Sequence, residues 1–233
     1  MAEENKEPEG HGDDTPEEKQ PKPTTLILVR HALNDWVGDK LAGWTPGVHL
    51  NDQGRAQAEA LAQRLADQAV AAVYTSPLER ALETAQIIAA PYQLEVQLRE
   101  GIGEVHYGEW TGQALKDLAK QDAWRVVQFY PSGAAFPGGE TIRAMQARAV
   151  AELDAIVAAH PAQTVVAVSH ADVLKAALAH YTGLHLDLFQ RLVVSPASLS
   201  VLSFTPMGPR LICLNDTAHI PQEKTDSQPE SRG

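Results

Sequence analysis

The sequence predicts one α/β domain in which a mostly parallel sheet is covered by helices on both faces, a three-layer α/β/α sandwich. Short apolar runs of strand length occupy residues 24–29, 71–75 and 164–168. Longer segments between them carry apolar residues every three or four positions, as helices that pack one face on a sheet do. Strands that alternate with helices form parallel sheets, and a chain of 233 residues with 44% hydrophobic content can bury one full core.

The first predicted strand, residues 24–29, contains only threonine, valine, isoleucine and leucine, and it ends in Arg30 and His31. Ligands bind at the carboxyl ends of strands in an open α/β sheet. An arginine beside a titratable histidine suits a phosphate or a carboxylate there, although a solvated pair at a strand end is common. Residues 36–50, with three glycines and a proline, form a predicted loop that is either a substrate wall or a plain connection.

The remaining elements are predicted from helical or alternating spacing and from flanking caps, glycines and prolines. They are a helix over 52–68 capped by Asn51 or Asp52, a strand at 71–75, a helix from Ser76-Pro77 to about residue 90, a strand at 94–98, a glycine-rich segment at 99–112, short helical pieces at 113–129, a loop at 130–139, a helix over 140–160, a strand at 164–168 and a helix at 172–181. Closing strands are expected at 192–194, 199–204 and 210–214, the last two as a hairpin through 205–209.

Composition divides the chain and narrows its class. Of the net charge of −11, residues 1–23 carry −5 and residues 217–233 carry −1, so we expect an acidic disordered tail, a domain over 24–216 and a flexible C-terminal tail. A mildly acidic domain argues against nucleic acid and anionic membranes as partners. The single cysteine, Cys213, excludes a disulfide framework and is expected to be buried. Without a visible signal peptide or membrane span, the expected location is cytoplasmic.

Two predicted strands end in histidine, because the strand at 164–168 runs into Ser169 and His170. In a parallel sheet both ends lie at the same edge, which Arg80, near the start of its helix, and Glu104, in its loop, can also reach. Two histidines, two arginines and a carboxylate form a coherent phosphoryl-transfer site. A neutral imidazole would attack, the arginines would hold the phosphoryl oxygens, and the carboxylic acid would protonate the departing oxygen.

The chain resembles the histidine phosphatase superfamily, the phosphoglycerate-mutase-like proteins. The resemblance covers about residues 24–216 and is carried by five motifs in the family's order: LVRH at 28–31, SPLERALETA at 76–85, EVHYGEWTG at 104–112, PGGET at 137–141 and VSHAD at 168–172. It implies a phosphoglycerate-mutase-like fold and a small phosphorylated metabolite as substrate. It also implies chemistry that needs neither a metal nor an organic cofactor, in line with the lack of metal-ligand spacing in the sequence.

By this resemblance His31 is the nucleophile that becomes phosphorylated, and Glu104 is the general acid and base. Arg30, Arg80 and His170 match the residues of the phosphate pocket, and Gly108 supplies a turn after Glu104. Some positions depart from the family pattern: Ala32 and Ala171-Asp172 stand where glycine is usual, and Val37 replaces a frequent asparagine. Asn34 is a candidate substitute donor.

GWTPGVHLNDQG at 43–54 is similar to the substrate loop of the mutases, which makes Gly43 and Trp44 candidate substrate-binding residues, and His106 is a candidate for the pocket rim. The segment between Glu104 and His170 is short and lacks the paired arginines of the mutases, while PGGET resembles the phosphatase branch. We therefore expect a phosphatase, with a phosphomutase (an isomerase) as the alternative and a non-catalytic binding module less favoured. The physiological substrate and the oligomeric state stay open, a homodimer included.

Overall fold

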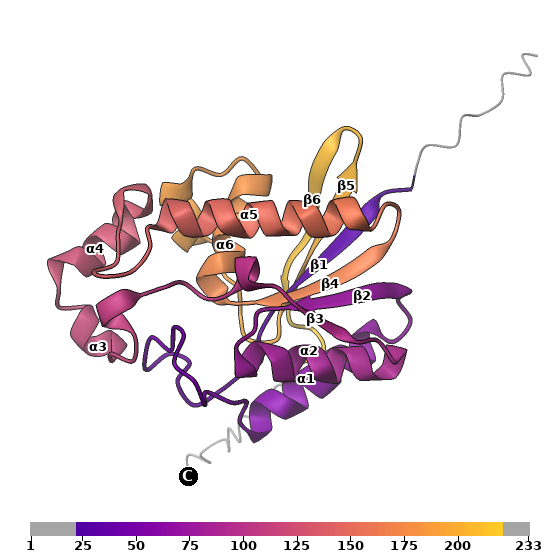
Figure 1. Cartoon of the computed structure of the whole chain (residues 1–233), viewed down its shortest axis with the longest axis horizontal. Helices are drawn as coiled ribbons and strands as arrows, with labels where there is room; N and C mark the ends of the chain where they lie inside the picture. The colour runs from indigo at the N-terminus through magenta and orange to yellow at the C-terminus, as the bar shows by residue number, and fades with distance from the viewer. Residues whose placement is uncertain (1–21, 221–233) are drawn as a thin grey trace, which may run out of the picture.

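The computed structural model describes residues 22–220, so most of both predicted tails (1–23 and 217–233) lies outside the described residues, and the domain limits stay a prediction. The element order is strand and helix in alternation along most of the chain (Figure 1). No helix among the described residues is long and apolar enough to cross a membrane.

One six-stranded sheet forms the centre of the molecule, in the order β3-β2-β4-β1-β5-β6. Strands β1 to β4 pair in parallel, whereas β5 runs antiparallel to both of its neighbours, β1 and β6. The strands are β1 (Thr24–Arg30), β2 (Val70–Thr75), β3 (Val96–Leu98), β4 (Thr164–Ser169), β5 (Leu199–Thr205) and β6 (Gly208–Asp216). The prediction of a mostly parallel sheet is confirmed.

Helices cover both faces of this sheet, which gives the three layers (Figure 1). On one face α1 (Asp52–Leu65) and α2 (Glu79–Ala89) pack on Ile27, Val29 and their neighbours. On the other face α5 (Ile142–Ala159) and α6 (Ala171–Tyr181) pack on Leu26 and Leu28. The strand residues alternate between the two cores because successive side chains of a strand point to opposite faces.

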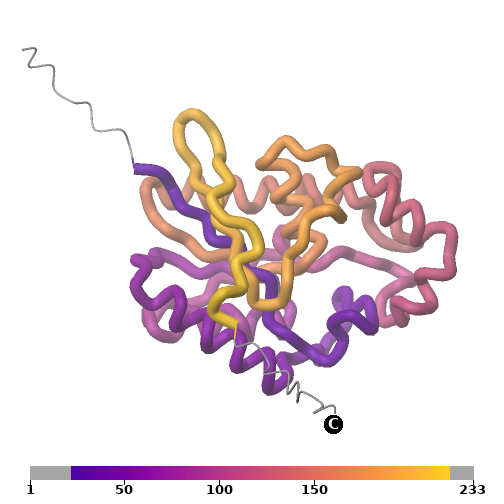
Figure 2. The backbone as a smooth tube through the Cα atoms, turned by 180° about the vertical axis from the view of Figure 1, so that it is seen from behind, coloured from indigo at the N-terminus to yellow at the C-terminus, as the bar shows by residue number. Residues whose placement is uncertain are grey.

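A smaller helical region lies beyond the carboxyl ends of the parallel strands, opposite the loop that follows β1 (Figures 1 and 2). It consists of short pieces around a second apolar core that includes Trp110, Phe136 and Phe189. The pieces are α3 (Leu115–Leu118), α4 (Asp122–Phe129) and the 3-10 turns η3 (Gly108–Trp110), η4 (Pro131–Gly133) and η5 (Leu186–Arg191). Short turns also follow α2 and β3, at η1 (Ala90–Tyr92) and η2 (Glu100–Ile102).

A predicted strand and a predicted helix cap are absent from the structure. Residues 192–194 form no strand: Leu192 is the C-cap of η5, and the carbonyl of Val194 accepts from the side chain of Arg30. Ser76 does not cap α2, whose N-cap is Leu78 without a side-chain hydrogen bond. The predicted cap of α1 is confirmed at Asn51, whose side chain accepts from the backbone N–H of Gly54.

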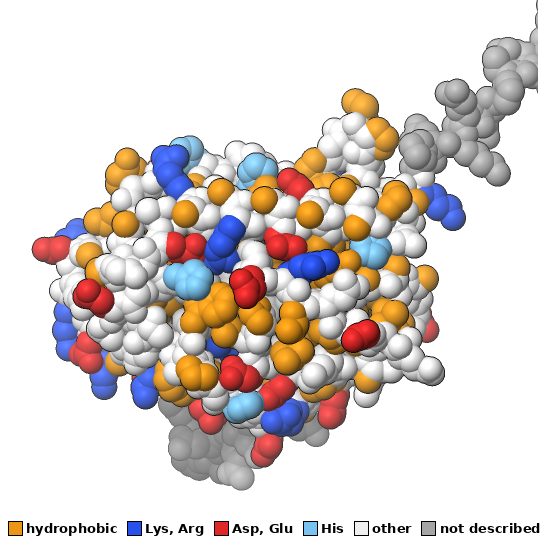
Figure 3. Space-filling view, in the orientation of Figure 1, with side chains coloured by type: hydrophobic (Ala, Val, Ile, Leu, Met, Phe, Trp, Pro, Cys, Tyr) orange, Lys and Arg blue, Asp and Glu red, His pale blue; other side chains and the backbone are white. Residues whose placement is uncertain are grey.

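The β5–β6 hairpin is confirmed and projects from the body of the molecule (Figure 2). Its outer strand β6 carries Leu211, Ile212 and Leu214 exposed, and Cys213 is half-buried rather than buried, because β6 is the edge strand. Figure 3 shows basic and acidic side chains interspersed over the face that it presents, with apolar atoms between them.

Candidate active site

The register of the sheet places the two histidines side by side. Arg30 lies opposite Ser169 in the parallel pairing of β1 with β4, so His31 and His170 are each the first residue beyond the paired segment. Their ring centroids lie 5.2 Å apart. Backbone bonding continues past the strands, since the N–H of His31 donates to the carbonyl of Ser169 over 2.9 Å. The sheet itself therefore fixes the spacing of the pair.

His31 is buried and its tautomer is set by its own loop. Its Nδ1 lies 2.8 Å from the carbonyl oxygen of Ala32, which can only accept, so Nδ1 carries the proton and Nε2 carries the lone pair. Burial and the charges of Arg80 and Arg30 hold the pKa of His31 well below its ordinary value of 6.5. The ring is thus a neutral imidazole with a free nitrogen at neutral pH.

His170 is fully buried and has the opposite tautomer. Its Nδ1 accepts from Nη2 of Arg80 at 3.3 Å, so the proton lies on Nε2, which is 2.8 Å from Oγ of Ser76. Burial, followed by the charge of Arg80, holds the pKa of His170 well below 6.5. Ser76 therefore belongs to the site, and sequence reasoning treated it as a helix cap. Its position directly after β2, at the same edge as the histidines, was the available signal.

The two arginines bring guanidinium groups to this edge from β1 and from the first turn of α2. Nη2 of Arg80, which is 1% exposed, donates to the carbonyl of Gly43 over 3.0 Å, and Nη1 of Arg30 donates to the carbonyl of Val194 over 2.8 Å. In the described part of the chain, Nε of Arg30 and Nη1 of Arg80 are buried without a hydrogen-bond partner. An unpaired buried donor is costly, and a phosphoryl oxygen would satisfy each one.

Glu104 supplies a buried carboxyl beside this cationic pair. Its Oε1 accepts from the backbone N–H of Val105 over 2.9 Å. Its Oε2 lies 3.7 Å from Nη2 of Arg80 and 3.6 Å from Nδ1 of His170. Burial raises the pKa of Glu104 above its ordinary value of 4.5, against the attraction of Arg80. A carboxyl whose pKa is raised in this way holds its proton to higher pH, which suits it to act as an acid.

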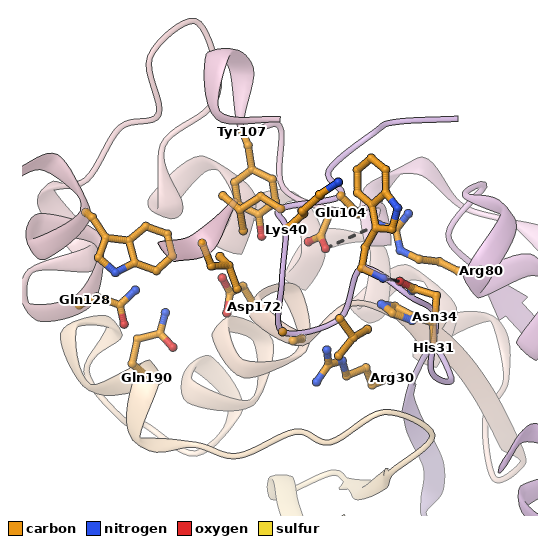
Figure 4. A pocket seen from close by; sticks show the side chains of 18 residues that line it. Arg30, His31, Asn34, Lys40, Arg80, Glu104, Tyr107, Gln128, Asp172 and Gln190 are labelled. Atoms are coloured by element: carbon orange, nitrogen blue, oxygen red, sulfur yellow. Dashed lines mark hydrogen bonds and ion pairs between the residues drawn. The ribbon is translucent and has the colours of Figure 1, made fainter. Parts of the chain in front are cut away.

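These groups open into a pocket of about 280 Å³ that the loop after β1 and the helical region enclose (Figure 4). Arg30, His31, Arg80 and Glu104 line its inner end. Gln128 and Gln190 lie at the opposite end in Figure 4. Asn34, the predicted substitute donor, also lines the pocket. The remaining polar and aromatic lining residues have no predicted binding role; they are Trp36, Lys40, Tyr107, Trp124 and Asp172.

Four predicted substrate-binding residues do not line this pocket: His170, which is buried against Arg80 and Ser76, and the three outer candidates Gly43, Trp44 and His106. The carbonyl of Gly43 holds Arg80 from outside the wall. The indole N–H of Trp44 donates to the backbone carbonyl of Glu104 over 2.7 Å, behind the carboxyl. His106 is exposed and stacks on Trp44 with ring centroids 4.6 Å apart. Gly43 and Trp44 thus bond Arg80 and the backbone of Glu104, and His106 packs on Trp44. Of the outer candidates, Asn34 is the one that lines the pocket.

The residues that depart from the family pattern lie in or beside the pocket. Ala32 is fully buried, and its N–H donates to Oγ1 of Thr84 over 3.0 Å. Val37 and Ala171 line the pocket with Asp172, whose carboxylate is 3.3 Å from Nζ of Lys175. Among residues 22–220, no three or more histidines, cysteines or acids lie together so that they could hold a metal ion.

The arrangement is that of an anion site: a neutral imidazole, two guanidinium groups and a buried carboxyl at the carboxyl edge of a parallel sheet. Comparison with known proteins identifies the family. The model of the histidine phosphatase superfamily (branch 1) matches residues 26–217, and the chain belongs to that superfamily.

Individual relatives agree with this assignment. Phosphoserine phosphatase 1 of Hydrogenobacter thermophilus is 33% identical over 200 residues, 84% of this chain and 93% of that protein. The structure of YhfR from Bacillus stearothermophilus superposes with a TM-score of 0.80 at 30% identity, covering 85% of this chain and all (100%) of the other. Phosphoserine phosphatase of Entamoeba histolytica, solved with 3-phosphoglyceric acid, gives a TM-score of 0.78 at 27% identity over 85% of this chain and 100% of that one.

Proposed function

We propose that this protein hydrolyses a small phosphomonoester through a phosphohistidine on His31. The observation that carries the proposal is the free Nε2 of a buried neutral imidazole beside two guanidinium groups with unpartnered donors. In the first step Nε2 attacks phosphorus and the ester bond breaks, while Arg30 and Arg80 hold the phosphoryl oxygens. The carboxyl of Glu104 gives its proton to the departing alkoxide, which leaves as an alcohol.

In the second step water attacks the phosphohistidine, and the now ionised Glu104 takes a proton from that water. The N–P bond breaks, inorganic phosphate forms, and both His31 and Glu104 return to their starting states. His170 acts through Arg80, because its unprotonated Nδ1 accepts from that guanidinium and Ser76 fixes the ring from the other side. The family implies no metal or cofactor for either step.

A phosphatase is favoured over a phosphomutase by the outer end of the pocket. A mutase has to hold a bisphosphorylated species, so it needs a second anion site. The end opposite His31 carries Gln128 and Gln190, which are uncharged. Apart from Arg30 and Arg80, the described lining holds one cation, Lys40, whose ammonium lies 5.0 Å from the centre of the Trp36 ring, and it also holds the carboxylate of Asp172. One exposed lysine in a pocket with a carboxylate is a poor second site for a phosphoryl group. A binding module is disfavoured because every group that the two steps need is present.

The proposed substrate is a small phosphorylated metabolite whose identity the lining does not specify. Relatives are named phosphoserine phosphatases and a mycobacterial glucosyl-3-phosphoglycerate phosphatase, so amino-acid and sugar-acid monoesters are the first compounds to try. A cytoplasmic location stays a prediction from sequence, and the oligomeric state stays open.

The proposal is tested by assaying phosphomonoester hydrolysis in a metal chelator. We expect the wild type to be active and His31→Ala to lose at least about a thousandfold in kcat. His180→Ala, which changes an exposed histidine on α6, is the matched control and should retain full activity. Wild-type activity that appears only after a divalent cation is added would refute the mechanism. Conversion of a monophosphate to its positional isomer with a bisphosphorylated primer, without release of phosphate, would favour the mutase.

A further inference from the structure

Glu104, the proposed general acid, lies on a segment without regular structure. It follows η2 and precedes η3, and residues 104–107 belong to no helix or strand. Its carboxyl is bonded to the next N–H along the same segment, that of Val105. The position of the proton donor therefore depends on whatever holds this backbone, because the segment has no ladder of its own.

Arg148 on α5 holds this backbone through hydrogen bonds to its carbonyl groups. Its Nη1 donates to the carbonyls of Gly101 and Gly103, over 2.9 Å each, and its Nη2 donates to the carbonyl of Glu104 over 2.9 Å. Its Nε and Nη2 also form a two-pronged pair with Glu140, at 3.0 and 2.7 Å. A guanidinium has five N–H donors, and these contacts use all of them.

Glu140, the partner of Arg148, bonds the backbone of the same segment at His106. Its Oε1 accepts from the N–H of His106 over 2.9 Å, and its own N–H donates to the carbonyl of His106 over 2.9 Å. Trp44 adds a further donor to the carbonyl of Glu104. The backbone on both sides of Glu104 is thus bonded to the guanidinium of Arg148 and to its partner carboxylate, although Arg148 lies 44 positions further along the chain.

We infer that Arg148, held by Glu140, is a positioning residue that keeps the carboxyl of Glu104 aligned with the departing oxygen of the substrate. Arg148 does not line the pocket, so it acts through Glu104 and not on the phosphoryl group. The inference rests on the proposed role of Glu104 as the acid. Lysine cannot replace Arg148, because an ammonium has three donors and no planar fork.

The test compares leaving groups in Arg148→Met and Arg148→Lys. An alkyl phosphate needs a proton on its departing oxygen, whereas 2,4-dinitrophenyl phosphate has a leaving group stable enough to depart without one. A displacement of about 1 Å in a catalytic group costs about a hundredfold, so we expect kcat/KM for the alkyl ester to fall by that order and kcat/KM for the dinitrophenyl ester by less than about threefold. The comparison uses kcat/KM because it reports the first step alone, in which Glu104 acts only as an acid, whereas kcat includes the attack of water, which needs Glu104 for both esters. The inhibition constant of inorganic phosphate should stay within about twofold of the wild-type value, because Arg30, Arg80 and His31 are untouched.

Arg143→Met is the matched control, since Arg143 lies on the same helix and donates to a backbone carbonyl, that of Ser132, away from Glu104. It should lower neither rate. If Arg148→Met fails to fold, Trp44→Phe removes a single donor to the carbonyl of Glu104 and should show the same leaving-group dependence on a smaller scale.

Each outcome separates the inference from the function on which it rests. The positioning role alone would be overturned if Arg148→Lys lowered kcat/KM equally for both esters, or lowered neither, while Glu104→Gln lowered kcat/KM for the alkyl ester and spared the dinitrophenyl ester. If Glu104→Gln lowers kcat/KM equally for both esters, Glu104 is not the acid and the inference falls with it. Wild-type inactivity on both esters would refute the proposed function.

Discussion

Replacement of Arg80 by methionine changes the pocket at its most connected point. Arg80 is 1% exposed, donates to Gly43 and His170, and lies 3.7 Å from Glu104. Methionine has a similar length without donors or charge. The unpartnered Nη1 of Arg80 carries two N–H donors. A charge-assisted hydrogen bond contributes about 1.5–3 kcal/mol, so the loss of two such bonds from Nη1 to the phosphoryl group amounts to about 3–6 kcal/mol. At about 1.4 kcal/mol per factor of ten, kcat/KM should fall by about 10² to 10⁴.

The pH dependence of Arg80→Met carries a second, independent signature. Arg80 is the largest charge, after burial, that lowers the pKa of His31, and it is the largest influence that opposes the rise in the pKa of Glu104. Without it both pKa values rise. Activity needs His31 neutral and Glu104 protonated, so it falls below the pKa of the first and above the pKa of the second. Both limbs of the kcat/KM profile should therefore move to higher pH.

The assay is kcat/KM for one phosphomonoester from pH 4 to 10, measured for the wild type and three variants. Arg80→Lys keeps the positive charge but lacks the planar fork of the guanidinium. The two limbs of its pH profile should therefore lie where those of the wild type lie, while its kcat/KM should stay low. Arg64→Met is the control, because Arg64 forms an exposed pair with Asp216. A loss below tenfold in Arg80→Met, or limbs that move to lower pH, would refute this account of the pocket.

Three further changes test other parts of the structure. Glu104→Gln should lower kcat/KM for alkyl phosphates by about 10² to 10⁴ and abolish the basic limb of the pH profile; a basic limb that persists would assign it to another group. Folding stability should fall as pH drops below about 6.5, because the pKa values of His31 and His170 are lowered in the folded state and the unfolded chain then binds protons that the folded chain rejects. Urea midpoints at pH 7.5 and 5.5 measure this fall, which should be smaller in a variant with glutamine at both positions; an equal fall would contradict the assignment. Gly108→Ala should destabilise the fold by more than about 2 kcal/mol, since Gly108 has φ +55° and a Cβ there would lie 2.1 Å from a backbone oxygen of the PGGET loop. Gly112→Ala, at φ +80° with open space, should cost only about 1 kcal/mol in the same urea titration; similar losses would mean that the contact is not the cause.

The part of the site that could be predicted from sequence is the part that strands position. Apolar runs mark β1 and β4, and a parallel pairing brings the residues that follow them to one edge, so His31 and His170 could be placed together without coordinates. Arg80 followed from its position at the start of a helix. Such inferences succeed because they depend on local pattern and on one rule of topology.

The parts that were missed depend on contacts between distant segments. Ser76 looks like a helix cap in sequence, and only its place at the end of β2 shows that it faces His170. Arg148 has the pattern of a solvated helix residue, yet it bonds carbonyls 44 to 47 positions away. The apolar residues at 192–194 suggested a strand, but backbone partners decide whether such a short run joins a sheet, and Val194 bonds a side chain instead.

The central claim, that His31 carries the phosphoryl group, is tested most directly by trapping the intermediate. The enzyme is mixed with excess ³²P-labelled phosphomonoester, quenched in alkali within milliseconds, digested and mapped by mass spectrometry. The account predicts a label that is stable in alkali, lost in acid and located on the peptide that contains His31. Phosphate on a serine, such as the neighbouring Ser76 or Ser169, or turnover without any labelled protein, would contradict it.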